Sequence, residues 1–199
     1  MTNHYYSENP ETEHQLKYWS FPLLGKEFQF VTDSGVFSRE TVDFGSRLLI
    51  ESFDANELPA GTILDVGCGY GPIGLALVYD TKLPVEMIDV NNRAIELAKQ
   101  NAEKNQLTAD IHQSNIYADL HQKEYAAIIS NPPIRAGKKV VHEILSGAFD
   151  LLKPQGSLTI VIQKKQGAPS AKNKMAEVFG NVETIAKDKG YFILKSIKE

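Results

Sequence analysis

The 199-residue chain has little cysteine and no long apolar run. Its single cysteine, Cys68, excludes an internal disulfide and a cysteine-rich zinc site. No stretch approaches the roughly 20 apolar residues of a membrane helix, and the first residues lack the basic and apolar segments of a signal peptide. The sequence therefore predicts a cytoplasmic protein without a membrane partner.

A positive net charge is also missing. The net charge is −4, from 21 Lys and Arg against 25 Asp and Glu, which as a whole disfavours a nucleic-acid binder. The charge is uneven, however: residues 1–134 carry 9 basic and 19 acidic residues, and residues 135–199 carry 12 and 6. Such an asymmetry arises either from solvated helix faces or from one end of the molecule facing a polyanion.

From about residue 41 the apolar pattern alternates between strands and helices, which predicts an α/β fold. Thr41 is the expected cap of the first helix. The expected strands are 62–66, 85–89, 109–113, 126–130, 157–162, 182–187 and 191–197. The expected helices are 41–53, 72–79, 92–105, 139–152 and 171–179. We predict a Rossmann-like, seven-stranded, mostly parallel sheet with helices on both faces and an antiparallel last strand.

The aromatic-rich start of the chain, residues 1–38, departs from this alternation. Residues 28–31 resemble a short strand, followed by a turn at 33–35. We interpret 1–38 as an N-terminal extension packed on a main domain of residues 39–199.

Ligands of such sheets bind outside the carboxyl ends of the strands. After the first predicted strand stand Gly67, Gly69 and Gly71, which allow a ligand to approach the backbone closely. With Gly74 the loop also matches the dinucleotide fingerprint, a weak signal on its own. Asp65, two residues before the first glycine, disfavours a pyrophosphate and suits a cationic amine.

Three further side chains follow the next strands. Asp89 can accept hydrogen bonds from both ribose hydroxyls, Val90 can cover one face of an adenine, and Asn115 offers a donor and an acceptor to an adenine edge. For Asp89 the alternative is a helix cap, and for Asn115 a polar turn.

After the fourth strand comes Asn131-Pro132-Pro133-Ile134. The prolines lack amide donors and fix the backbone, so this corner is rich in acceptors. The Asn131 amide oxygen and the Pro132 carbonyl could each accept one N–H of a substrate amine. The alternative is a rigid loop without a ligand.

Together these segments resemble the class I S-adenosylmethionine-dependent methyltransferases, which implies S-adenosyl-L-methionine as the cofactor. Residues 131–134 look like the Asn-Pro-Pro-aromatic motif of enzymes that methylate planar amino groups. Segments 35–38 and 43–49 narrow the resemblance to the small-subunit (16S) ribosomal RNA guanine-N2 methyltransferases, in a single-domain form. Ile134 departs from the aromatic residue of that motif, so either Phe37 supplies the platform for a base or the substrate differs.

This resemblance implies direct methyl transfer to guanine N2 of ribosomal RNA, free or within a ribosomal subunit. The catalytic residues would be Asn131, Pro132, Pro133 and Ile134, without a dedicated base or a metal; His112, the one histidine near a strand end, is given a surface role. The RNA would be bound by Arg135, Lys138, Lys139, Lys164 and Lys165.

Three alternatives remain open from the sequence. A protein-glutamine N-methyltransferase uses a similar Asn-Pro-Pro motif, and a nicotinamide-dependent oxidoreductase would use Gly69, Gly71 and Gly74. A non-catalytic RNA-binding module is the third. The sequence carries no signal for an oligomeric state.

Overall fold

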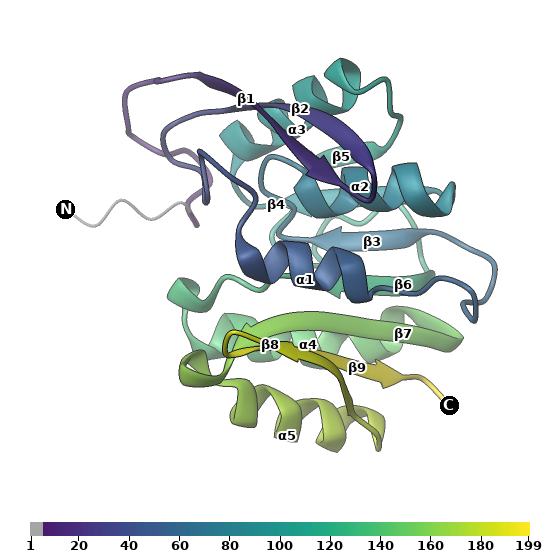
Figure 1. The fold of residues 1–199 in the computed structure, drawn as a ribbon. Helices are drawn as coiled ribbons and strands as arrows, with labels where there is room; N and C mark the ends of the chain where they lie inside the picture. The colour runs from purple at the N-terminus through teal and green to yellow at the C-terminus, as the bar shows by residue number, and fades with distance from the viewer. Residues whose placement is uncertain (1–5) are drawn as a thin grey trace.

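A computed structural model describes residues 6–199, which form strands, helices and two short 3-10 helices (Figure 1). The strands are β1 Lys17–Leu23, β2 Lys26–Thr32, β3 Ile63–Val66, β4 Val85–Asp89, β5 Asp110–Gln113, β6 Tyr125–Ser130, β7 Leu152–Gln163, β8 Glu183–Asp188 and β9 Tyr191–Ile197. The helices are α1 Phe44–Ser52, α2 Pro72–Thr81, α3 Asn92–Lys104, α4 Lys138–Leu151 and α5 Ala168–Phe179, with the 3-10 helices η1 Ile134–Ala136 and η2 Lys164–Gln166.

Seven strands form one sheet in the order β5-β4-β3-β6-β7-β9-β8. Strands β3 to β7 are parallel, and β9 runs antiparallel to both β7 and β8. The predicted seven-stranded, mostly parallel sheet with an antiparallel last strand is confirmed. The strand order reverses between β3 and β6, so a ligand site is expected at the carboxyl ends of these two strands.

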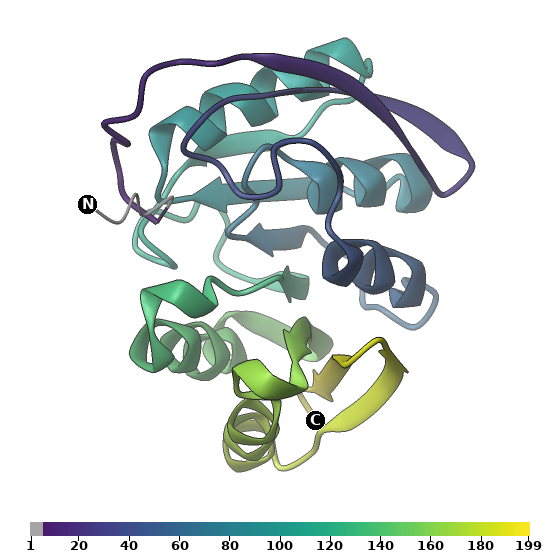
Figure 2. The same ribbon diagram turned by 60° about the vertical axis from the view of Figure 1, so that its left-hand side comes forward.

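Helices cover both faces of the sheet (Figures 1 and 2). The central strands are buried on both sides, and their alternate side chains enter two separate apolar clusters. Ile63 and Ile129 pack with α1, α2 and α3, whereas Leu64 and Ile128 pack with α4 and α5. None of the helices in the described part of the chain has the length and apolar character that crossing a bilayer requires.

The expected cap of the first helix is wrong. Helix α1 begins after Asp43, whose Oδ2 accepts the Ser46 amide at 3.1 Å. The carbonyl of Thr41 instead accepts the hydroxyls of Ser38 and Tyr70, which holds this part of the chain outside the helix. As the helix cap, Asp43 also lines the cavity at the carboxyl ends of the parallel strands.

The N-terminal segment contains a hairpin of β1 and β2, of which the sequence predicted only a part of β2. Strand β2 lies against α3, where Asn101 and Asn105 bond its outer backbone edge. The Asn101 amide pairs with the N–H and the carbonyl of Val31 at 2.7 and 3.0 Å, and Asn105 pairs likewise with Gln29 at 2.9 and 2.8 Å. The rise of one helical turn between the two asparagines is close to the spacing of alternate residues in a strand. Their side-chain amides therefore make the hydrogen bonds that a neighbouring strand would make at this edge.

The chain before the hairpin crosses the start of α3. The carbonyl of Glu8 accepts the Asn92 amide at 2.9 Å, and the Arg93 guanidinium donates to the carbonyls of Pro10 and Thr12. We call residues 6–14 the N-terminal strap. The division of the chain at residues 38 and 39 into extension and main domain stays a prediction.

Candidate active site

A cavity of about 250 Å³ opens at the carboxyl ends of the parallel strands. Its wall comes from the turns after β3, β4, β5 and β6 and from the segment before α1. Of the predicted site residues, the wall contains Phe37, Gly67, Gly69, Asp89, Val90, Asn131, Pro132, Pro133, Ile134 and Arg135.

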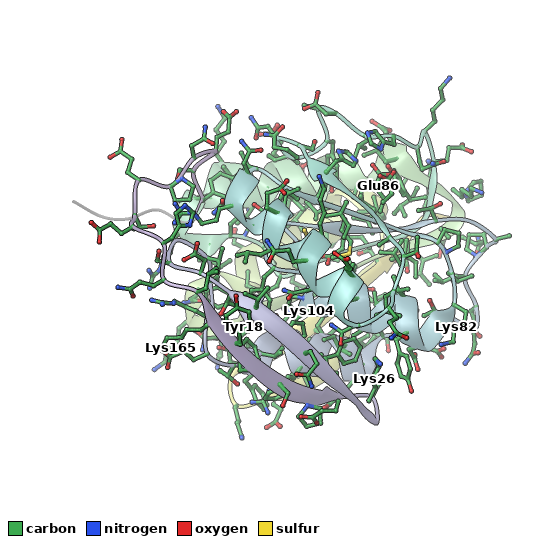
Figure 3. The ribbon with its side chains drawn as sticks, turned by 90° about the horizontal axis from the view of Figure 1, so that it is seen from above. Tyr18, Lys26, Lys82, Glu86, Lys104 and Lys165 are labelled. Carbon is green, nitrogen blue, oxygen red and sulfur yellow. The ribbon has the colours of Figure 1, made fainter. Side chains whose placement is uncertain are left out.

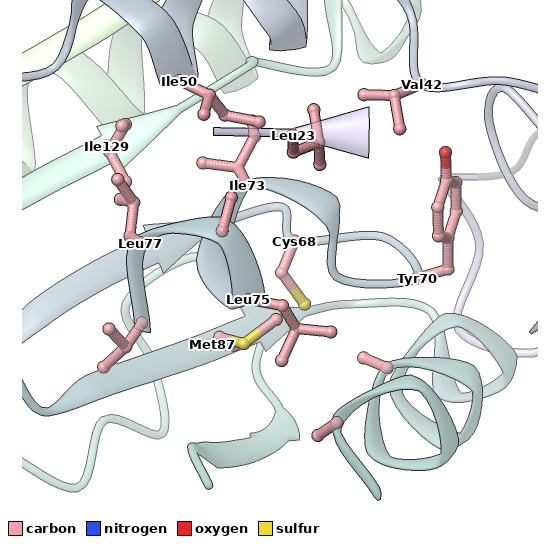
Figure 4. Close-up of a cluster of buried hydrophobic side chains, with 14 of the residues drawn as sticks. Leu23, Val42, Ile50, Cys68, Tyr70, Ile73, Leu75, Leu77, Met87 and Ile129 are labelled. Carbon is pink, nitrogen blue, oxygen red and sulfur yellow. The ribbon is translucent and has the colours of Figure 1, made fainter. Parts of the chain in front are cut away.

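The glycines after β3 divide into two groups. Gly67 and Gly69 have φ angles of 74° and 57°, and a Cβ on either would meet only open space. A Cβ on Gly71 would lie 3.1 Å from Leu75 and Met87, and one on Gly74 would lie 2.7 Å from Met87. The first pair therefore leaves room for a ligand, whereas Gly71 and Gly74 let α2 pack tightly on β4 above the core drawn in Figure 4.

Asp65 lies beneath this loop and not on the cavity wall. Its side chain is fully buried; Oδ2 accepts the Gly74 amide at 2.9 Å, while Oδ1 has no hydrogen-bond partner among residues 6–199. Burial raises the pKa of the Asp65 carboxyl to about 7, repulsion from Asp89 adds to the effect, and the Gly74 bond opposes it. An unpartnered buried oxygen suits a cationic group, so the predicted role toward an amine remains a prediction with a physical basis.

Asp89 ends β4 and is fixed by the backbone. Its Oδ2 accepts the Gly69 amide and its Oδ1 accepts the Asn91 amide, both at 2.9 Å. Burial raises the pKa of the Asp89 carboxyl, and these bonds act against the increase. Each oxygen keeps a lone pair for a further donor, as binding of ribose hydroxyls requires. Val90 beside it lines the cavity, as does Tyr6 of the strap.

The turn after β5 does not bring Asn115 onto the cavity wall. Ser114 and Ile116 line it instead, and Asn115 is exposed. Ile116 has a φ of 52°, and its carbonyl accepts the Ser114 hydroxyl at 2.8 Å. This tight turn directs the amide outward, so a contact of Asn115 with an adenine stays a prediction.

The Asn131 amide has a defined orientation. Its Nδ2 donates to the Ser46 hydroxyl at 3.0 Å and approaches Asp43 Oδ2 at 3.4 Å. A carboxylate can only accept, so the amide nitrogen must face it. The Asn131 oxygen accepts no hydrogen bond from any residue in 6–199, and neither does the Pro132 carbonyl. Two acceptors are therefore available at one corner of the cavity.

Apolar and aromatic side chains surround this corner. Ile134 lines the cavity, and Phe37 does so with 47% of its surface exposed. Several other wall residues were not predicted from the sequence. Asp43, Ser46 and Tyr70 lie within segments that were recognised but were given no role of their own. Tyr6, Gln163, Gln166 and Tyr191 come from distant segments and carry no motif.

The predicted basic residues lie around the cavity and not within it, except for Arg135. Lys138 and Lys139 are exposed at the start of α4, and Lys164 and Lys165 are exposed in η2. Gln163 and Gln166, on either side of this pair, line the cavity. The positive charge thus gathers at the cavity's edge.

A seven-stranded sheet with a reversed β8–β9 pair, a glycine loop after the first strand and an acid after the second define a class I S-adenosylmethionine-dependent methyltransferase. The chain belongs to the methyltransferase small domain family, whose model matches residues 27–195. The predicted class and its cofactor, S-adenosyl-L-methionine, are confirmed at this level, and the oxidoreductase alternative is set aside.

Several relatives are similar to this chain. It is 54% identical over its full length to the Bacillus subtilis (strain 168) protein named Uncharacterized protein YbxB, whose full length it also covers. It is 32% identical to Ribosomal RNA small subunit methyltransferase C of Erwinia tasmaniensis, over 91% of this chain and 52% of the relative. The 16S rRNA N2 methyltransferase RsmC of T. thermophilus, solved in complex with AdoMet and guanosine, superimposes with a TM-score of 0.84. That match has 25% identity and covers 92% of this chain and 51% of the other. The chain thus spans about half the length of these rRNA methyltransferases.

Proposed function

We propose that this methyltransferase acts on an exocyclic amino group, namely guanine N2 of small-subunit ribosomal RNA, in the bacterial cytoplasm. The observation that carries the proposal is the orientation of Asn131. With its amide nitrogen directed to Ser46, its oxygen and the Pro132 carbonyl form a pair of acceptors for one –NH₂ group. The similarity of this chain to rRNA methyltransferases favours guanine as the base that carries this –NH₂ group.

Gly67, Gly69, Asp89 and Val90 would hold the cofactor, with Asp65 beneath them. The open space above the two glycines and the unpartnered Asp65 oxygen fit a ligand with a ribose and an amine. When bound, S-adenosyl-L-methionine supplies a methyl group that its sulfonium has already activated.

The chain's own task is then to position the amine. Guanine N2 is a weak nucleophile because its lone pair is delocalised, and positive charge develops on it during transfer. The Asn131 oxygen and the Pro132 carbonyl would hold its two hydrogens, aim its lone pair and stabilise that charge. Ile134 and Phe37 would cover the faces of the base, and the surplus proton would leave to solvent.

Arg135 and the four lysines around the cavity would contact RNA phosphates. They would dock the strand while a base is turned out of its stack into the pocket. This arrangement favours RNA over the protein-glutamine alternative, because binding of a single glutamine side chain needs no basic surface around the site.

The test is a methyl-transfer assay with a labelled methyl donor. Unmodified 16S rRNA, small subunits assembled from it, and a glutamine-containing peptide would be parallel substrates. We expect N2-methylguanosine in the digested RNA and no label in the peptide. Label in the peptide alone would establish the glutamine alternative, and cofactor binding without transfer to any substrate would favour the non-catalytic module.

A further inference from the structure

Four potential metal ligands meet at the end of the sheet opposite the active site. They are Glu86 of β4, Asp110 and His112 of β5, and His121 in the loop before β6. One ligand atom from each lies within 4.8 Å of all the others. Glu86 is the second residue of β4 and pairs with Asp110 at the start of β5, whereas Asp89 ends β4 at the cavity. Figure 3 shows Glu86 far from Lys165, which marks the active-site edge.

The centre of this cluster is a buried carboxylate. The Glu86 side chain is 1% exposed, and its Oε1 lies 2.8 Å from Nε2 of His112. The same oxygen accepts the His121 amide at 2.9 Å, and Oε2 accepts the Tyr125 hydroxyl at 2.7 Å. These neutral donors hold the carboxylate in one orientation without neutralising its charge, which leaves a role for a cation.

Each imidazole has one ring nitrogen beside a carboxylate of the cluster, and because the two rings stack, the exposed His121 must turn before both rings can ligate one ion. Nε2 of His112 donates to Glu86 Oε1 at 2.8 Å, because a carboxylate can only accept; an ion bound between these two atoms would replace that proton, and Nδ1, 3.1 Å from the Gln113 carbonyl, would then carry the ring proton. A backbone carbonyl behind a ligating imidazole is the usual second contact of zinc-bound histidines. Nδ1 of His121 lies 2.8 Å from Asp110 Oδ2, and the two rings stack with centroids 3.6 Å apart.

The cluster is also accessible and adjustable. Glu86 and Asp110 line a second cavity, of about 300 Å³, through which an ion can enter. The side chains of His121 and Asp110 are 53% and 46% exposed, so they can move to close the gap between the 4.8 Å limit and a tetrahedral ligand spacing of about 3.3 Å.

We propose that Glu86, Asp110, His112 and His121 bind one divalent transition metal ion of the Zn²⁺ type. Two imidazole nitrogens and two carboxylate oxygens suit Zn²⁺ and not Mg²⁺, which prefers oxygen and water. The ion would tie β4, β5 and the loop at 114–124 together. This revises the sequence-based expectation of no metal, because the four residues form no motif and only the fold collects them.

The experiment is a calorimetric titration of the untagged, chelator-treated protein with Zn²⁺ and, separately, Mg²⁺. We expect one Zn²⁺ per chain, no heat with Mg²⁺, and a rise of Tm by about 5 to 10 °C at a Zn²⁺ concentration 100 times the Kd. With Co²⁺ the protein should show the strong visible absorption of a tetrahedral complex.

His121→Ala removes an exposed ligand and is expected to weaken Zn²⁺ binding by at least 10- to 100-fold, about the factor that losing a metal-site contact costs. Asp110→Asn is a second variant that leaves the rings in place. His14→Ala is the matched control, because His14 is also an exposed histidine beside a carboxylate, that of Asp33. Equal Zn²⁺ binding by wild type and His121→Ala, or an equal loss in His14→Ala, would overturn the proposal and leave a hydrogen-bonded network.

Discussion

A single asparagine determines which atoms the amine-binding corner offers to a substrate. An amide can present either its nitrogen or its oxygen, and the choice decides whether it can accept a hydrogen bond. Asp43 and Ser46 of the α1 start settle that choice for Asn131, so the helix cap and the catalytic corner share one carboxylate.

Replacing Asn131 by Ala should lower the rate of methyl transfer by about 10²- to 10³-fold, the cost of losing one oriented group at a site of developing charge. Ser46→Ala should lower it by about 10-fold, because Asn131 remains but is held only by the longer contact with Asp43. Single-turnover rates and the Kd of S-adenosylhomocysteine would be measured together. An equal loss of cofactor affinity and rate would show that Asn131 supports the cofactor instead.

Asp65 makes the stability of the protein depend on pH. An unfolded aspartate has a pKa of about 4, and burial raises the folded value to about 7. Folding therefore takes up a proton between these values, and the stability falls as the pH rises from about 4 to about 7.

From pH 5 to pH 8 the wild type should lose about 2 to 3 kcal/mol more of its free energy of unfolding than Asp65→Asn. Denaturant unfolding of both ligand-free proteins at the two pH values measures this difference. Asp89, whose pKa is also raised, is present in both proteins and largely cancels. Parallel pH profiles would mean that the carboxyl is already ionised at pH 5.

At the scale of elements, α3 holds the hairpin through side-chain amides. Asn101 is fully buried and bonds the N–H and carbonyl of Val31 and the carbonyl of Tyr70. It thus joins α3, β2 and the glycine loop, three elements that no backbone ladder connects.

Asn101→Ala should destabilise the protein by about 2 to 4 kcal/mol, because it leaves buried polar groups of the backbone unpaired. Gln100→Ala, on the exposed side of the same helix, is the matched control and should change the stability by less than about 0.5 kcal/mol. Urea denaturation of the two variants tests the prediction, and equal midpoints would contradict it.

The elements that the sequence predicted well are those with a strong local pattern. Strand β3 follows from a buried apolar run bounded by glycines, and α3 follows from apolar residues at helical spacing. Strand β1 was missed because most of its inward residues are only half-buried and an aromatic residue, Tyr18, stands on its exposed face, which weakens the alternation of apolar and polar residues. The cap at Asp43 was missed because the bond from Tyr70 to Thr41 comes from a distant segment.

In the candidate site, too, local motifs could be predicted from the sequence, whereas contacts between distant segments could not. Glycines and Asn-Pro-Pro are local motifs, so they could be found from the sequence and placed at strand ends. Whether Asn115 or its neighbours reach the cavity depends on a single turn angle at Ile116. The wall residues Tyr6, Gln163 and Tyr191 approach only through the sheet order, which the sequence does not encode locally.

At the scale of the whole molecule, the sign of the exposed charge around the active site differs from that of the net charge. Lys138 and Lys165 belong to the exposed basic residues around the cavity, whereas the net charge of the chain is −4. A polyanion approaching the molecule responds to the local sign, so the overall charge does not exclude RNA.

This difference predicts how RNA binding should depend on salt. Lys138→Glu with Lys165→Glu reverses charge beside the cavity, and Lys26→Glu with Lys82→Glu reverses the same charge at the far end, where both lysines lie over Tyr79. The first pair should weaken 16S rRNA binding and lower the slope of log Kd against log salt by about one unit for each lost phosphate contact. The second pair should leave the slope unchanged, although the net charge falls equally. Equal slopes for both double variants would mean that only the overall charge matters, and that the basic surface around the active site does not dock the RNA.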